Sequence, residues 1–106
     1  MDIDELALCL EKLGHPNRLE IFRLLVRAGH YGLPVGDIQR HLGIPASTLT
    51  HHIAQLVSAG LVRQTREGRV LRCTAAYERM EKIMGALTAE CCSGVAVENE
   101  GELSDG

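Results

Sequence analysis

The pattern of apolar and polar positions along the chain predicts five helices and one hairpin. Apolar side chains recur every three or four positions in five segments, a spacing that places them on one face of a helix. The five segments are residues 3–13, 16–27, 35–42, 47–59 and 75–92. Two short segments, 61–65 and 70–74, flank a glycine-containing turn and are expected to form strands. The chain is therefore predicted to be mainly α, with a small β-hairpin before the last helix.

The fourth predicted helix combines an apolar face with a face of small polar side chains. Leu49, Ile53 and Leu56 recur at helical spacing and are expected to face the core. Such a helix, followed by an arginine-containing hairpin, suits insertion into the DNA major groove with the hairpin resting on the backbone beside it. We predict that eight side chains contact double-stranded DNA. They are Ser47, Thr48, Thr50, His51 and Gln55 on the helix, and Arg63, Arg66 and Arg69 in the hairpin.

The distribution of charge agrees with this prediction, although the net charge of −3 on 106 residues does not. Between Arg40 and Arg72 there are five arginines and one glutamate, a local net charge of +4. Phosphate binding depends on the local field rather than on the total charge. Four acidic residues and no basic one lie in residues 98–106, so residues 93–106 are expected to form an acidic, disordered tail.

The composition also narrows the location of the protein and the state of its cysteines. No apolar run approaches the length of a membrane span, and the first residues are acidic where a secretory signal would be basic. We therefore expect a cytoplasmic protein without a membrane partner. Its four cysteines are then expected to be thiols rather than structural disulfides. They are Cys9, Cys73, Cys91 and Cys92.

Two runs of residues resemble the ArsR/SmtB family of winged-helix repressors. The run LGHPNRLEI at residues 13–21 is similar to the start of that family's second helix, and residues 50–68 are similar to its recognition helix and wing. The resemblance extends over about residues 5–92. It implies a winged helix-turn-helix domain spanning residues 1–92, a homodimer, and a repressor that leaves its operator when an inducer binds. In this family the first and last helices form the subunit interface, which implies interface roles for Leu6, Leu10, Met80, Ile83, Met84 and Leu87.

Members of this family differ in where the inducer binds. The third predicted helix has no cysteine and the last has no histidine, so the cysteine cluster of the founding arsenic sensors and the zinc site are both absent. Cys91 and Cys92 remain, and adjacent thiols can reach one soft centre only where the backbone leaves rigid helix. Residues 88–92 resemble the thiol pair of an arsenic-responsive subgroup. This resemblance implies arsenite or methylarsenite as inducer, with antimonite a further candidate.

Cys9 is open to two interpretations. By family analogy its helix lies beside the last helix across the dimer, where the thiol would be a third metal ligand. It is also explained as a small buried apolar residue. No cofactor is expected for DNA binding itself.

Three other functions are weighed against an arsenic-responsive repressor. A persulfide or redox sensor of the same fold is the main alternative, but the second predicted helix lacks the cysteine that such sensors pair with one on the last helix. A thiol enzyme lacks support, because the chain has no Cys-x-x-Cys motif, general-base arrangement or phosphate loop. A dimeric interaction module that does not bind DNA is the third alternative.

Overall fold

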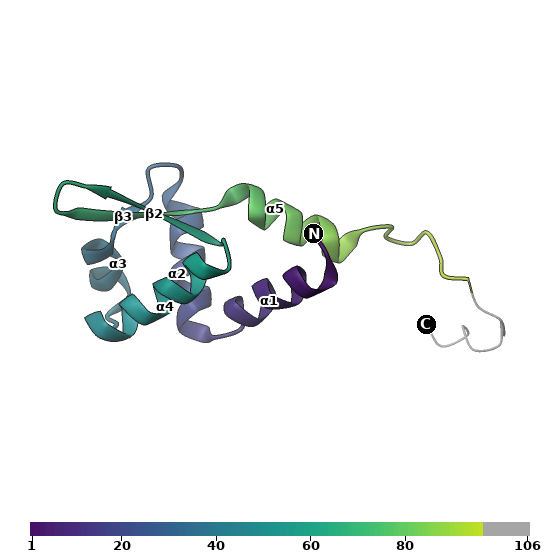
Figure 1. Cartoon of the computed structure of the whole chain (residues 1–106), viewed down its shortest axis with the longest axis horizontal. Helices are drawn as coiled ribbons and strands as arrows, with labels where there is room; N and C mark the ends of the chain where they lie inside the picture. Colours follow the sequence, from purple (N-terminus) through teal and green to yellow (C-terminus); the bar gives the residue numbers. More distant parts are fainter. Residues whose placement is uncertain (97–106) are drawn as a thin grey trace.

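The computed structural model describes residues 1–96, in which five helices pack together beside one small sheet whose hairpin projects at one end (Figure 1). The elements in chain order are α1 (Ile3–Leu13), α2 (Pro16–Ala28), β1 (Leu33–Pro34), α3 (Val35–Leu42), α4 (Ala46–Ser58), β2 (Val62–Glu67), β3 (Val70–Ala75) and α5 (Tyr77–Thr88). This order confirms the predicted fold class, a mainly α winged helix-turn-helix. Most of the predicted acidic tail, residues 97–106, lies outside the described residues. None of the helices in residues 1–96 has the length and apolar character of a membrane span.

The sheet contains a strand that the sequence pattern did not predict. Its order is β1-β3-β2, with both neighbouring pairs antiparallel. Cys73 at the centre pairs with Leu33 on one side and Gln64 on the other. No strand was predicted between the second and third helices, so the sequence pattern missed β1. A strand of two residues is too short to show an alternation of apolar and polar positions. Its pairing with β3 exists only in the folded chain.

The hairpin is also longer than predicted, and its turn is shorter. Arg66 and Glu67, expected in the turn, pair with Leu71 and Val70 as strand residues. Only Gly68 and Arg69 connect the strands, and Gly68 has a φ of 64°. A two-residue turn of this kind favours glycine because its backbone visits the left-handed region.

The last helix is shorter than the predicted 75–92. Ala75 belongs to β3 and pairs with Val62, so α5 begins only at Tyr77. The helix ends at Thr88, before the two adjacent cysteines. Glu90 and Cys92 then adopt left-handed backbone, with φ of 57° and 63°. Cys91 and Cys92 therefore lie in a turn and not in the helix.

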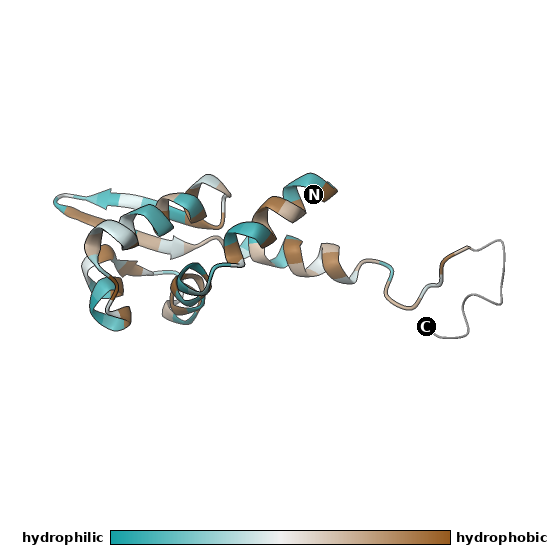
Figure 2. Cartoon of the chain, turned by 90° about the horizontal axis from the view of Figure 1, so that it is seen from below, coloured by the Kyte–Doolittle hydropathy of each residue, from teal (hydrophilic) through white to brown (hydrophobic). Residues whose placement is uncertain are grey.

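The core is aliphatic and draws on every helix. Leu49, Ile53 and Leu56 of α4 are buried as predicted, and Ile21, Phe22 and Leu25 form the inner face of α2. Hydrophobic and hydrophilic positions alternate around the helices in Figure 2. Leu19 on the same helix is 43% exposed. This core holds α4 against α2 and leaves its opposite face to solvent.

The end of α4 sets the direction of the wing. The amide of Leu61 donates to the carbonyl of Leu56 (3.0 Å) and that of Gly60 donates to Val57 (2.9 Å). These two bonds form a Schellman motif, which requires the left-handed φ of 73° found at Gly60. The predicted helix stop at Gly60 is thus confirmed. The chain turns sharply at this joint, defined here as Ala59, Gly60 and Leu61, and continues into β2.

Candidate nucleic-acid interface

The first turns of α4 present the polar face that the sequence predicted. Ser47, Thr50 and His51 are exposed, and Thr48 is half-buried. The Thr50 hydroxyl donates to the carbonyl of Ala46 (2.9 Å), which fixes its rotamer on the helix surface. The helix begins after Pro45, and no side chain caps its first amides. The first amides and the hydroxyls of Ser47 and Thr48 are donors suited to base edges and phosphate oxygens, and the Thr50 oxygen can still accept a hydrogen bond.

Gln55, also predicted to contact DNA, already has a hydrogen-bond partner within the protein. Its amide oxygen accepts a hydrogen bond from the ammonium of Lys12 on α1. The side chain is half-buried and sits two turns beyond the exposed end of α4. In a recognition helix the N-terminal residues contact base edges. In this structure Gln55 therefore joins α4 to α1 rather than standing free on the polar face.

The three predicted arginines of the wing differ in their surroundings. Arg63 on β2 forms an ion pair with Glu78 on α5. Arg66 and Arg69, at the hairpin tip, are exposed and form no ion pair within residues 1–96. Arg69 also lines a hollow of about 400 Å³ together with Thr50 of α4. The hairpin tip and α4 thus border one surface. The arginines of this surface that form no ion pair within the described residues, Arg66 and Arg69, lie at the hairpin tip.

His52 lies on the inner edge of α4 and is buried. Its Nδ1 is 3.4 Å from Nη1 of Arg18, and its ring centre is 4.5 Å from that of His15. Burial lowers the pKa of His52 below its ordinary value, and His15, Arg18 and His51 lower it further. The imidazole is therefore neutral at pH 7 and serves packing rather than charge.

The four cysteines fall into two classes. Cys91 and Cys92 are exposed, with their sulfur atoms 3.4 Å apart. Cys9 and Cys73 are fully buried: the Cys9 thiol donates to the carbonyl of Ala59 (3.7 Å), and Cys73 accepts from the Gln64 amide (3.6 Å). Burial raises the pKa of Cys73 above its ordinary value, which keeps the thiol protonated. Within the described part of one protomer no three potential metal ligands cluster, so Cys9 does not join the Cys91–Cys92 pair of its own chain.

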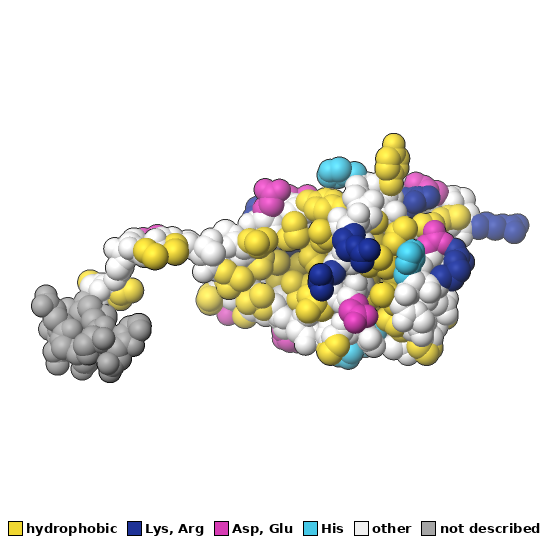
Figure 3. Space-filling model, turned by 180° about the vertical axis from the view of Figure 1, so that it is seen from behind, with side chains coloured by type: hydrophobic (Ala, Val, Ile, Leu, Met, Phe, Trp, Pro, Cys, Tyr) yellow, Lys and Arg dark blue, Asp and Glu magenta, His cyan; other side chains and the backbone are white. Residues whose placement is uncertain are grey.

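The six residues predicted at a dimer interface also divide. Leu6 and Ile83 are buried within the protomer, and Met80 is half-buried against its core. Leu10, Met84 and Leu87 are exposed, the last two by 61% and 58%. Figure 3 shows hydrophobic side chains gathered at the end of the domain from which the C-terminal segment extends. This end, formed by α1 and α5, lies opposite the hairpin tip (Figure 1).

Comparison with known proteins relates the chain to transcriptional regulators. A family described as a helix-turn-helix domain matches residues 13–65. The biofilm growth-associated repressor of Agrobacterium fabrum is 30% identical over 89 residues, covering 84% of this chain and 74% of the relative. The HTH-type transcriptional regulator YgaV of Escherichia coli is 27% identical over 89 residues, covering 84% and 88%. An ArsR-like transcriptional regulator from Rhodococcus superposes with a TM-score of 0.70 at 25% identity, covering 79% of this chain and 76% of its own.

The chain belongs to the ArsR/SmtB family of winged-helix transcriptional regulators. Its class of function is therefore DNA binding and regulation of transcription, not catalysis. Within this class, α4 is the recognition helix and β2–β3 is the wing.

Sequence reasoning missed two contacts that organise the interface. Lys12 anchors Gln55, and Arg79 on α5 contacts the end of the recognition helix. Neither residue forms part of a motif, and each meets its partner across a large distance in sequence. Only the packing of α1 and α5 against the rest of the domain could identify them.

Proposed function

We propose that this protein is a homodimeric repressor whose hold on its operator is released when trivalent arsenic binds Cys91 and Cys92. Methylarsenite is the inducer that the site fits best. The operator is double-stranded DNA read in the cytoplasm by two copies of α4. The observation that carries the proposal is the pair of exposed thiols just beyond the end of α5, with their sulfur atoms 3.4 Å apart.

The geometry of the pair suits one bridging centre. Bonds of about 2.3 Å, the length of a zinc–thiolate bond, join one centre to two sulfurs up to about 4.6 Å apart. The 3.4 Å separation falls within this reach. In rigid helix the two side chains would diverge by about 100°. Left-handed backbone at Glu90 and Cys92 turns the chain out of that arrangement.

The number of available thiols favours methylarsenite over arsenite. Methylarsenous acid carries two hydroxyl groups, and each thiol replaces one of them with release of one water. Two As–S bonds form, two As–O bonds break, and arsenic keeps its oxidation state. Arsenite has a third hydroxyl group and is satisfied fully only by a third thiolate. Cys9 is buried and bound to Ala59, so supplying that thiolate would require the packing of α1 against α4 to open.

The exposed apolar face of α1 and α5 supports a dimer through these helices. Leu10 on α1 and Met84 and Leu87 on α5 expose large apolar side chains. The same face of a second copy would cover these side chains. Each Å² of apolar surface removed from water in this way stabilises the dimer by about 25 cal/mol. An arsenical closing on the thiols at this end would shift the interface. The arsenical would bind the DNA-free protein more tightly than the DNA-bound protein. The free energy of DNA binding that is lost equals the difference between these two free energies of arsenical binding, typically about 1–3 kcal/mol.

The test measures release from a duplex taken from upstream of the protein's own gene. Fluorescence anisotropy follows the complex during titration with methylarsenite, arsenite, antimonite, zinc, cadmium and polysulfide. Cys91→Ser and Cys92→Ser are expected to bind this DNA normally and to lose release by methylarsenite. Ser93→Ala changes the same exposed turn, keeps both thiols, and should behave as the unmodified protein.

Two outcomes would contradict the proposal. Normal release of both cysteine variants by methylarsenite would place the inducer site elsewhere. Release by polysulfide alone, with a mass increase at Cys91 or Cys92, would favour the persulfide-sensing alternative.

A further inference from the structure

The carbonyl of Ala59 receives donors from both terminal helices. This residue caps the C-terminus of α4, where no further helical amide is available to its carbonyl oxygen. Nε of Arg79 on α5 donates to it at 3.3 Å, and the thiol of Cys9 on α1 donates to it at 3.7 Å. Nη1 of Arg79 also lies 3.5 Å from a carboxylate oxygen of Glu5 on α1. One guanidinium therefore links α5, α1 and the end of the recognition helix.

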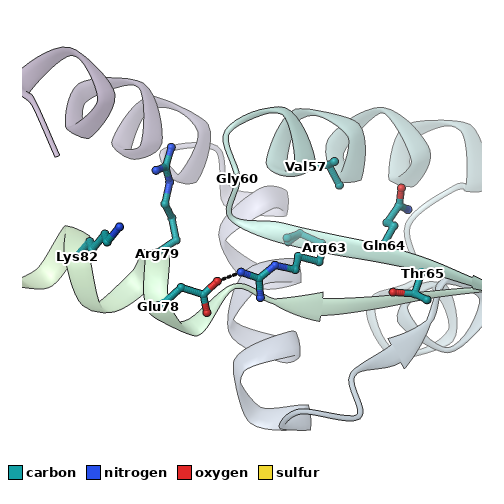
Figure 4. A pocket seen from close by; sticks show the side chains of 9 residues that line it. Val57, Gly60, Arg63, Gln64, Thr65, Glu78, Arg79 and Lys82 are labelled. Atoms are coloured by element: carbon teal, nitrogen blue, oxygen red, sulfur yellow. Dashed lines mark ion pairs between the residues drawn. The ribbon is translucent and has the colours of Figure 1, made fainter.

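Two further contacts tie the start of α5 to the same joint. The amide of Ala76 donates to the carbonyl of Leu61 (2.9 Å), two residues beyond Ala59. Glu78 pairs with Arg63 on the first strand of the wing. Figure 4 shows this pair as a dashed line, with Arg79 directed from α5 toward the joint and α1. The first turn of α5 thus contacts both elements that read DNA.

The packing at the joint is tight. A Cβ added at Gly60 would lie 3.3 Å from Nε of Arg79. The Arg79 side chain is only 28% exposed. Its positive charge stands at the C-terminus of α4, where the helix dipole is negative and favours a cation. Both its charge and its close packing therefore allow Arg79 to fix the orientation of α5 relative to the end of α4.

We propose that Arg79 is a positioning residue that holds the recognition helix and wing in their DNA-reading orientation relative to α5. It contacts no DNA itself. This inference rests on the proposed function in one respect: the same contact carries the movement of α5 caused by an arsenical to the end of α4. Without Arg79, the Ala59 carbonyl keeps only the weak thiol donor of Cys9. The end of α4 then loses its charged link to α5, and the Lys12–Gln55 bond remains as the charged link between α4 and α1.

The experiment compares Arg79→Met with the unmodified protein and with Glu5→Gln. Met keeps much of the apolar stem and removes every donor, whereas the Glu5 variant keeps the bond to Ala59. Operator affinity is measured over a range of salt concentrations, with the dimer checked by sedimentation. Arg79→Met is expected to weaken operator binding about tenfold, the size of one charge-assisted hydrogen bond. The slope of log affinity against log salt should stay unchanged, because no phosphate contact is lost.

A second measurement addresses coupling. Methylarsenite should still bind the thiol pair of Arg79→Met with unchanged stoichiometry. The operator affinity without methylarsenite, divided by the affinity with it, should fall toward one in this variant. Arg79→Lys keeps the positive charge and an ammonium donor, and should restore part of the affinity and of the ratio. It also provides the test if Arg79→Met fails to fold. Glu5→Gln is expected to change both quantities less than Arg79→Met.

The results separate the two proposals. A salt slope reduced by about one phosphate contact would show that Arg79 touches DNA, and would overturn the inference. Unchanged operator affinity in both Arg79 variants would overturn it as well. If the unmodified protein does not respond to methylarsenite, the proposed inducer is wrong, and the affinity and salt slope still decide the role of Arg79.

Discussion

Nη1 of Arg18 lies 3.4 Å from Nδ1 of His52, and this contact joins the start of α2 to the inner edge of the recognition helix. His15 caps the same end of α2, with its Nδ1 accepting from the amide of Asn17 (3.1 Å), and its ring lies against His52. The recognition helix is therefore seated on a group of basic side chains that tolerates a neutral imidazole and opposes a charged one.

This arrangement predicts a loss of stability in mild acid. The pKa of His52 is lowered in the folded state, so the unfolded chain binds the proton first as pH falls below about 6.5. The stabilisation is complete above that pH and disappears as pH falls through the lower folded value. Urea unfolding between pH 8 and pH 5 should show this decline, and His52→Gln should flatten it. His41→Gln, an exposed control on α3, should leave the decline unchanged.

Gly32→Ala is predicted to destabilise the fold strongly. A Cβ there would lie 1.9 Å from the backbone oxygen of Cys73, at the pairing of β1 with β3. Gly43 is the matched control, because its φ of 66° is close to the 64° of Gly32 and nothing lies within 4 Å of an added Cβ. Gly43→Ala should cost about 1–2 kcal/mol of unfolding free energy from backbone strain alone. Gly32→Ala should cost at least about 2 kcal/mol more, and equal losses would contradict the close contact.

The wing arginines are predicted to differ in their share of DNA binding. Arg66→Ala and Arg69→Ala should each weaken binding to all sequences and lower the salt slope by about one, as expected for a lost phosphate contact. Arg63→Ala should lower the slope less, because Arg63 is already paired with Glu78. Anisotropy titrations at several salt concentrations measure the three slopes. A larger change for Arg63 than for Arg69 would mean that its ion pair opens on DNA.

Gln55 is predicted to act in stability rather than in base recognition. Gln55→Met removes the acceptor of Lys12 and should cost about 1 kcal/mol of unfolding free energy. The ranking of operators that carry single base-pair changes should stay the same. His51→Ala, at an exposed position on the same helix, provides the contrast and should alter that ranking. Relaxed discrimination at one base pair in Gln55→Met would restore the base-reading role expected from the sequence.

Leu87→Glu is predicted to weaken the proposed dimer. The charge would stand on the apolar face of α5, where Leu87 is 58% exposed in one protomer. Sedimentation should show dissociation at concentrations where the unmodified protein is dimeric, and operator affinity should fall with it. Tyr31→Glu, at an 88% exposed apolar position near β1, should remain dimeric. A fully dimeric Leu87→Glu would place the interface on another surface.

The amino-acid sequence determined the class of fold and the location of the candidate sites. Helical spacing of apolar residues identified all five helices, because each must bury one face. The same periodicity placed Leu49, Ile53 and Leu56 in the core and thereby left Thr50 and His51 outside. The adjacent thiols could be predicted as a soft-ligand pair without a structure, because thiolate chemistry depends on residue type.

Only the tertiary structure decided which polar side chains are free and which are already bound. Gln55 and Arg63 have the chemistry of DNA contacts, yet each meets a partner from another element. Burial likewise separates Cys9, which the sequence left open to two interpretations, from the exposed Cys91 and Cys92. Such differences arise from approaches between segments distant in the chain, and no local pattern encodes those distances. The contact of Arg79 with Ala59 belongs to the same class, because it exists only where the end of α4 meets the start of α5.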